Sequence, residues 1–576
     1  MRRFWAALFL FLTVLGGIGC WYFFASVPLK ELPRDGFLPE GVKLENGTLN
    51  WFEVLKSQYP EGWQTDRNAF RRLAKTVLLH ERGRYRPALS DEEREEILEK
   101  QEEMMELLAL EPEEWKNAGF LSDPLSAYKE MLHEKYADDD AEREKRDAED
   151  AMEIPGKDPV FAAEWVRENS PLLDEIARIV QDSEMFFIPM VGDGRYCAMN
   201  QLLPYSAFAR SLANGLIFRA AYRIAQGELD GAIADAAVCR HLSQLYQKDA
   251  IFLVEFLIGF NIGQIAKYLP FYENADAPLS EDQLMKLEES AQKYPMIAQE
   301  NVYSRIARNE RMVCLDMFLP SPYPKDPGFE PTNHPIFHLG VDWNAAVEEM
   351  LRIHTRRQTD PKLDLEAEQK EQLQKLYESF PLSFLLKKAG EAINELEGGS
   401  LFPWCLLPRK DRSILIGMAM DVICTQGHIQ LVFQRACDRA SLERILFARE
   451  RYRLANGGKC LPRTLSDADG KPLHSWRVLL LPYLGEAEKE LFAKIRLDEP
   501  WDSPHNAQFH AVNVEAFERK ISPNGGKIAK WNPGETFFAI GKDPDSELPL
   551  YFRSLEEPIC WMAPDPEPEP EEGSTP

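Results

Sequence analysis

The chain has 576 residues, of which 94 are acidic and 67 are basic, so its formal net charge is −27. This charge repels phosphate backbones and anionic lipid headgroups, and it excludes nucleic acid as an expected partner. The length exceeds that of one ordinary hydrophobic core, so we expect about two to four domains with a solvated, acidic surface.

The first residues predict a membrane anchor. The segment Phe4 to Val27 is almost entirely apolar or small and carries no charge, and it is long enough for a helix that crosses a hydrocarbon core of about 30 Å. Arg2 and Arg3 precede it and keep that end in the cytoplasm under the positive-inside rule. We therefore expect residues 1–30 to form a single-pass signal anchor in a bacterial inner membrane, with the bulk of the chain extracytoplasmic.

Two alternatives to an uncleaved anchor are a cleaved signal peptide and a lipid attached to Cys20. A signal peptide has a shorter apolar region, about 7 to 15 residues, that ends in small side chains. Here the aromatic residues 21–24 continue past the glycines at 16–19. Lipidation requires a leucine-like residue three positions before the cysteine, where Gly17 stands. Both features favour the uncleaved anchor.

Residues 31–155 are expected to form an acidic helical region interrupted by linkers. The segment Pro28 to Pro39 is rich in proline and mixed charge, which is typical of a tether from the membrane to the first fold. Amphipathic helices are predicted from Asp66 and, after a capping box, from Ser90. The segment 136–151 is nearly all charged, which fits a solvated helix or a disordered connector.

Residues 156–440 are expected to form a helical-hairpin bundle. Apolar side chains recur every three or four positions from Tyr205 to Ile224, and the pattern resumes at Leu229 after a break at Gly227. This predicts two antiparallel helices, and the phrase GELDGAIADA is similar to the turn of a tetratricopeptide-type hairpin. Since no copy recurs at a fixed period, we expect paired hairpins instead of a solenoid. Further helices are predicted from Ser280, from Asp342 to Arg357 and from Ile414 to Phe433.

The apolar segment Ile251 to Leu269 has two interpretations, a second membrane span and a buried core helix. Glu255, Asn261, Gln264 and Lys267 interrupt it. An ionisable side chain at the centre of a membrane costs roughly 2.5 to 3.5 kcal/mol on insertion scales, whereas the rim of a soluble bundle accommodates one. We therefore predict a buried core helix.

The pattern changes at Ser441, where a helix runs to the glycine pair 457–458 and a tryptophan-containing segment follows. Two sequence segments, HSWRVLLLPYL at 474–484 and DEPWDSPHN at 498–506, resemble the C-terminal module of bacterial prepilin-like proteins of unknown function. More loosely, they resemble the globular head of type II secretion pseudopilins. The resemblance covers 441 to about 540 and implies a small α+β fold and an association with the cell envelope. Because the apolar N-terminal segment lacks the glutamate of a pilin, we do not expect the chain to polymerise.

The loop 498–506 carries a candidate metal site. Asp498, Glu499 and Asp502 lie within five positions, and clustered oxygen ligands suit calcium; some pseudopilin heads bind calcium in a nearby loop. Alternatively, Asp498 and Asp502 serve as turn and cap residues beside prolines, and we favour this interpretation. Trp501 is expected to fold against the apolar face of the preceding helix and to anchor the module.

No motif predicts a catalytic residue or, apart from this calcium, a cofactor. His133-Glu134 lacks the second zinc-ligand histidine one turn later, and His505 near Asp502 is only a pair of polar residues in a loop. The nine cysteines show no paired C-x-x-C spacing of the kind that binds zinc.

The sequence thus predicts a mainly α protein with an N-terminal transmembrane helix, a helical-hairpin bundle, a small pseudopilin-like α+β module (441–562) and a disordered acidic tail (563–576). We expect a membrane-anchored extracytoplasmic interaction or scaffold protein of the bacterial envelope, with a protein partner. The alternatives are an extracytoplasmic hydrolase with a site assembled from dispersed residues, and an accessory component of a secretion or pilus-like assembly. A deep pocket with converging carboxylates would favour the hydrolase, and a shallow groove between helical hairpins would favour binding.

Overall fold

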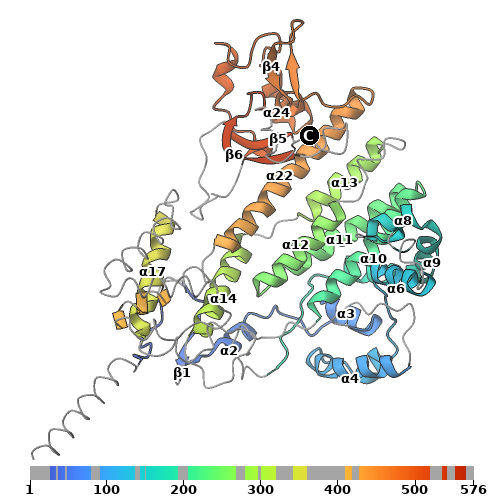
Figure 1. The fold of residues 1–576 in the computed structure, drawn as a ribbon, viewed down its shortest axis with the longest axis vertical. Coiled ribbons are helices and arrows are strands. Elements are labelled where there is room, and N and C mark those ends of the chain that lie inside the picture. Colours follow the sequence, from blue (N-terminus) through green and yellow to red (C-terminus); the bar gives the residue numbers. More distant parts are fainter. Residues whose placement is uncertain are drawn as a thin grey trace, which may run out of the picture.

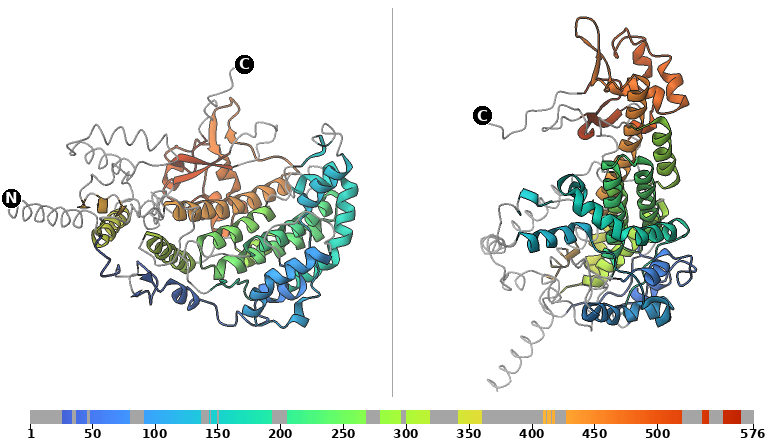
Figure 2. Two further views of the ribbon diagram at one scale, coloured as in Figure 1. Left: turned by 60° about the horizontal axis from the view of Figure 1, so that its bottom comes forward. Right: turned by 90° about the vertical axis from the view of Figure 1, so that its right-hand side faces the viewer.

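A computed structural model describes residues 26–33, 37–45, 48–79, 91–136, 143, 145–148, 151–192, 205–267, 279–295, 300–318, 341–359, 409–410, 412–414, 416–417, 427–518, 535–540 and 552–565. Within these ranges the chain is mainly helical, as the sequence predicts. A helical body makes up most of the molecule, and one long helix, α22, leads from it to a smaller C-terminal module (Figure 1). In the right-hand view of Figure 2 the module, in orange and red, stands at one end of the body.

The expected membrane anchor at Phe4 to Val27 lies outside the described residues, except for its last two positions. None of the helices in the described ranges is long and apolar enough to cross a membrane. The charged segment 136–151 also lies partly outside the described ranges.

The prediction of a free tether at Pro28 to Pro39 is wrong for the residues that the structure describes. Leu29, Phe37 and Leu38 are all at most 7% exposed, in a hydrophobic cluster shared with helices α2, α14 and α17. The Asn344 side chain bonds the backbone at both Pro28 and Lys30, at 3.0 and 2.9 Å. The apolar residues between the prolines are buried against the body.

The N-terminal region packs short helices against the body. Helix α3 begins at Ala69, three residues after the predicted start, because Asn68 and not Asp66 is the N-cap; its side chain accepts the amide of Phe70 at 3.1 Å. Phe70 and Leu73 on the inner face of this helix are fully buried, as an amphipathic helix requires. The elements of this region are β1 (Leu44–Glu45), β2 (Thr48–Leu49), α2 (Trp51–Lys56), α3 (Ala69–Thr76), α4 (Asp91–Leu107), α5 (Pro112–Trp115) and α6 (Pro124–Lys135).

The centre of the body is a set of antiparallel helices, among them the predicted hairpin. Helices α10 and α11 are joined by a turn in which Gly227 has φ +78°, a conformation that favours glycine. The buried pair Arg219–Asp235, with 2.7 Å between nitrogen and oxygen, joins the two helices. The helices of this part are η1 (Ala151–Glu153), α8 (Ile154–Lys157), α9 (Pro159–Gln181), α10 (Ser206–Ala225), α11 (Leu229–Asp249), α12 (Leu253–Lys267), α13 (Glu281–Lys293), α14 (Glu300–Phe318) and α17 (Trp343–Thr359).

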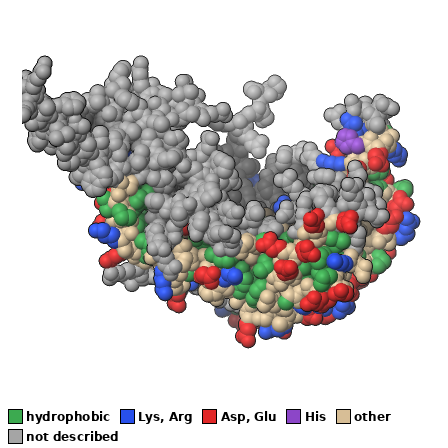
Figure 3. Space-filling view, turned by 90° about the horizontal axis from the view of Figure 1, so that it is seen from below, with side chains coloured by type: hydrophobic (Ala, Val, Ile, Leu, Met, Phe, Trp, Pro, Cys, Tyr) green, Lys and Arg blue, Asp and Glu red, His purple; other side chains and the backbone are tan. Residues whose placement is uncertain are grey.

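Helix α12 is a buried core helix, as predicted. It packs along α11 and contacts α10 and α14. Gly259 allows the close approach, because a Cβ at this position would lie 2.9 Å from Cγ of Gln247 on α11. On the face shown in Figure 3, acidic, basic and hydrophobic side chains of the described residues intermingle.

Helix α22 (Gly427–Ala455) runs without interruption across the predicted domain boundary at 440/441. Its last turns serve both parts of the molecule, since Phe447 packs into the core of the body and Ile445 and Ala448 into the core of the module. The helix ends before Gly457 and Gly458, which both have positive φ. The helix expected over 414–433 lies partly outside the described residues.

The C-terminal module combines short helices with two antiparallel strand pairs, β3–β4 and β5–β6. Trp476 and Trp561 fill its core, whereas Trp501 is only partly buried at the rim, where its ring lies against His510. Asp565, three positions into the predicted disordered tail, is buried against Arg477; residues 566–576 lie outside the described ranges. The elements are β3 (Thr464–Ser466), β4 (Pro472–Ser475), α23 (Trp476–Leu480), η3 (Leu481–Tyr483), α24 (Glu486–Phe492), η4 (Asn506–Phe509), η5 (Glu515–Phe517), β5 (Glu535–Ile540) and β6 (Phe552–Cys560).

Candidate functional site: a groove between the body and the module

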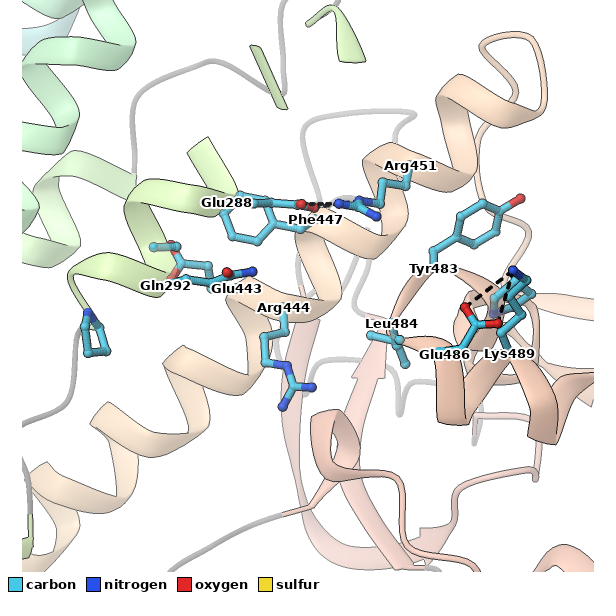
Figure 4. A pocket seen from close by; sticks show the side chains of 14 residues that line it. Glu288, Gln292, Glu443, Arg444, Phe447, Arg451, Tyr483, Leu484, Glu486 and Lys489 are labelled. Atoms are coloured by element: carbon cyan, nitrogen blue, oxygen red, sulfur yellow. Dashed lines mark hydrogen bonds and ion pairs between the residues drawn. The ribbon is translucent and has the colours of Figure 1, made fainter. Parts of the chain in front are cut away.

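A groove of about 710 Å³ lies between helix α13 of the body and the η3–α24 turn of the module, with the end of α22 as its floor. Figure 4 shows side chains from all three elements facing this space. The volume falls in the range of small-molecule and peptide sites, about 300 to 1,000 Å³. The groove exists only because α22 carries the module to the side of α13.

The floor is one face of α22. Glu443, Phe447 and Arg451 recur at four-residue steps, so their side chains lie above one another on the same side of the helix. Arg444 lies at the edge of this face and pairs with Glu515 of the module at 3.0 Å.

The first wall is α13, whose N-terminus has the predicted capping box between Ser280 and Gln283. Glu288 points from this helix to Arg451 on the floor, and the Arg451 Nε–Glu288 Oε1 distance is 2.8 Å (Figure 4). The Glu288 side chain is 12% exposed and that of Arg451 is 48% exposed. The ion pair therefore bridges floor and wall at one end of the groove.

Helix α11 supports the groove from inside the body. Arg240 forms a buried ion pair with Glu443 on the floor, and the next residue, His241, stacks on Tyr294 at the end of α13 with 4.3 Å between ring centroids. Burial lowers the pKa of His241 to about 4, and the nearby Lys293 acts in the same direction. The imidazole is therefore neutral at physiological pH, and these contacts hold α13 and α22 in a fixed geometry.

The second wall is the η3–α24 turn of the module. Its Tyr483 packs edge-to-face against Tyr452 of α22, with 5.8 Å between centroids. Leu484 adds an apolar side chain at the centre of this wall (Figure 4). Beyond it, Lys489 and Glu486 lie 3.5 Å apart on the first turns of α24.

The chemistry of the lining suits recognition better than covalent catalysis. Its acidic side chains Glu288, Glu443 and Glu486 each have a basic partner. The fourteen lining residues include no histidine, cysteine, serine or aspartate, so a Ser–His or Cys–His pair cannot be formed from them. What they offer is a mixed surface with apolar side chains at its centre and charges at its rim.

The candidate calcium ligands lie in a different part of the module and do not line the groove. Glu499 accepts hydrogen bonds from Arg496 Nη1 at 2.8 Å and Ser503 Oγ at 2.9 Å, and these two contacts lower the pKa of its carboxyl. Asp498 and Asp502 are exposed. Across the described ranges, no three His, Cys, Asp or Glu side chains are grouped to hold a metal ion.

The same loop is organised by a residue that the sequence did not single out. The Asn506 side chain is fully buried. Its Oδ1 accepts the amide of Arg496 at 3.0 Å, and its Nδ2 donates to the carbonyls of Arg496, Glu499 and Pro500. His505 donates to the carbonyl of Lys494 at 3.0 Å, so the suggested His505–Asp502 pair is not formed. In the sequence, Asn506 follows Pro500 and Pro504, and this pattern was the signal that could have identified it as a turn residue.

Comparison of the chain with protein-family models, with curated proteins and with solved structures finds no match. The resemblance of 474–484 and 498–506 to prepilin-like modules therefore stays a prediction.

Proposed function

We propose that this chain is a membrane-anchored, extracytoplasmic interaction protein of the bacterial envelope whose groove binds a peptide segment of a partner protein. The observation that carries the proposal is the groove between α13, α22 and the η3–α24 turn, a mixed apolar and charged surface of suitable volume. An extended peptide can place an apolar side chain on Leu484 and backbone groups near Arg444 and Arg451.

The contacts at the end of the proposed anchor support the envelope part of the proposal. Val27 exchanges backbone hydrogen bonds with Val341 and Trp343 at the start of α17, at 2.8 and 3.1 Å. If the apolar segment Phe4 to Val27 spans the membrane, its last residue is bonded directly to the body, and the body is held against the membrane surface. A scaffold needs such a fixed orientation toward partners in the same membrane.

The topology can be tested with protease added outside the inner membrane. The body should be degraded while the N-terminal segment stays membrane-bound. A mature N-terminus near Cys20 would instead support the cleaved or lipidated alternative.

The groove can be tested by placing a photo-crosslinking amino acid at Gln292, an exposed residue of the α13 wall, in the full-length chain in cells. The control position is Glu168, an exposed residue of α9 that lies outside the lining. We expect a discrete adduct from position 292 that disappears in Leu484→Glu and persists in Val160→Glu, a change at a side chain that is 75% exposed on α9. An adduct that survives Leu484→Glu, or that also forms from position 168, would rule out the groove as the binding site.

The resemblance of the module also supports a narrower version, in which the partner belongs to a secretion or pilus-like assembly. A crosslinked partner from such an assembly would favour it. The hydrolase alternative gains no support from the groove, whose lining lacks a Ser–His or Cys–His pair.

A further inference from the structure

The turn between α11 and α12, residues 250–252, lies where the two hydrophobic clusters of the body meet. Tyr246 of α11 belongs to the cluster of the helical hairpins. Ile251 and Phe252 belong to the cluster that contains α2, α17 and the segment 29–38. The start of α12 therefore joins the hairpins to the part of the body next to the proposed anchor. We call the turn at residues 250–252, with the side chains around it, the joint.

Two carboxylates hold the N-terminus of α12 at this turn. Oε2 of Glu255 accepts the amides of Ile251 at 2.7 Å and Phe252 at 2.9 Å. Oε1 of Glu310, from α14, accepts the amide of Leu253 at 2.7 Å. Three of the amides that a helix start leaves without partners are thus satisfied by two acidic side chains. Glu255 is 3% exposed, and within the described part of the chain neither carboxylate has an ion-pair partner.

The basic side chain near these carboxylates, Arg305, forms its hydrogen bonds with the end of α11. Arg305 of α14 donates to the carbonyls of Lys248 at 2.7 Å and Ala250 at 2.9 Å, at the end of α11. It therefore caps α11 and does not hydrogen-bond the carboxylates that cap α12.

The other titratable groups near this turn are Asp249, two phenols and the exposed Lys248, which lies near Asp249 at the end of α11. Asp249 at the end of α11 is partly buried, and among the described residues its Oδ2 has no hydrogen-bond partner; the same holds for the hydroxyl of Tyr246. The hydroxyl of Tyr59, which follows α2, accepts the amide of Met190 at 2.9 Å. Three carboxyls, two phenols and one guanidinium thus lie near this turn, and full ionisation of the carboxyls would leave an excess of negative charge there.

We propose that a proton held by the buried Glu255 carboxyl stabilises the joint, so that the closed start of α12 is more strongly favoured when Glu255 is protonated than when the proton is lost. Both amide donors to Glu255 share Oε2, which leaves Oε1 to carry the proton. Burial raises the pKa of Glu255 to about 7 despite the two amides, and the neighbouring Glu310 adds to this effect. Burial also raises the pKa of Glu310.

The direction of the pH dependence follows from whether the closed or the open turn binds the proton more tightly. When the turn is open, Glu255 titrates near its ordinary value of 4.5 and is ionised at neutral pH; when the turn is closed, it keeps the proton up to about pH 7. The closed form is therefore favoured at low pH and loses this advantage as the pH rises through 7. For these two pKa values, the ratio of closed to open turn falls about tenfold between pH 6 and pH 9.

Hydrogen exchange of the full-length chain in detergent, followed at the amides of residues 251–253, tests this inference. After correction for the intrinsic pH dependence of exchange, we expect the protection factor in the wild type to fall about tenfold from pH 6 to pH 9. Glu255→Gln keeps an oxygen that can accept both amides but cannot titrate in this range, and its protection should change less than twofold. Glu281→Gln, at an exposed carboxylate in the first turn of α13, is the matched control and should behave as the wild type.

Asp249→Asn removes the acid that accepts none of these amides, and it should retain most of the fall. Protection that is flat with pH in the wild type overturns the proposal, even if Glu255→Gln fails to fold. An unchanged fall in a folded Glu255→Gln protein would also overturn it, because the titrating group would then lie elsewhere.

Discussion

The ion pair between Arg477 and Asp565 makes a strong prediction about the end of the chain. Both side chains are fully buried. Asp565 also accepts the indole N–H of Trp476 at 3.0 Å, and Arg477 donates to the carbonyl of Ala563 at 3.2 Å. Asp565→Ala would leave the Arg477 charge buried without its carboxylate, a change that typically costs about 3 to 5 kcal/mol. We therefore expect this substitution to unfold or loosen the module while the helical body stays intact.

Urea unfolding of the full-length chain in detergent, followed by pulse proteolysis with cleavage sites assigned by mass spectrometry, separates the module from the body. The control is Asp498→Ala, which removes an exposed carboxylate from the same module and should change the free energy of unfolding by less than about 0.5 kcal/mol. Replacing both partners, Arg477→Met with Asp565→Leu, should recover much of the loss, because an apolar pair needs no charge compensation. If Asp565→Ala stays within about 1 kcal/mol of the wild type, the tail does not contribute to the core and the reasoning fails.

Three further predictions concern packing, pH and metal binding. Gly259→Ala should destabilise the body by about 1 to 3 kcal/mol, because the new methyl group would lie 2.9 Å from Gln247 Cγ and 3.3 Å from the Ser243 carbonyl; Gly156→Ala, where a Cβ has no neighbour within 4 Å, should have little effect in the same thermal melts. Because burial holds the pKa of His241 at about 4 in the folded chain, against 6.5 when unfolded, the wild type should lose up to about 3 kcal/mol of stability as the pH falls from 6.5 to 4. His241→Phe, which keeps a ring against Tyr294, should lack that part of the loss, and equal pH profiles for the two proteins would contradict this assignment. For the loop 498–506, we expect calcium to leave the melting temperature unchanged; a rise of several degrees in the wild type but not in Asp498→Asn would identify a calcium site.

Features that depend on residues close together in the sequence could be predicted without the tertiary structure. The hairpin of α10 and α11 follows from apolar positions at helical spacing and a glycine at the turn, and the capping box at Ser280 follows from two side chains three positions apart. Helix α12 was separated from a membrane span by the polar side chains within it. Each of these features depends on residues within a few turns of one another, so a single sequence contains the required information.

The burial and capping role of Glu255 could not be predicted from the residues near it in the sequence. Its charge was the reason to reject a membrane span, and it was placed at the rim of the bundle. The structure instead buries it at the start of α12, where it bonds two backbone amides. Whether a carboxylate caps a helix from inside the core depends on which elements cover that end, and α14 and the residues after α2 come from distant parts of the chain.

By itself the sequence determined the helical class, the hairpin and the cap at Ser280, because hydrophobic period and capping act over one or two helical turns. Only the tertiary structure decided that 28–39 docks on the body, that Asp565 completes the module's core and that α13, α22 and the η3–α24 turn enclose a groove. These features join residues tens to hundreds of positions apart, as in the contacts of Asn344 with Pro28 and of Arg451 with Glu288. Such contacts depend on how buried surfaces match in three dimensions, and no spacing along the chain encodes that match.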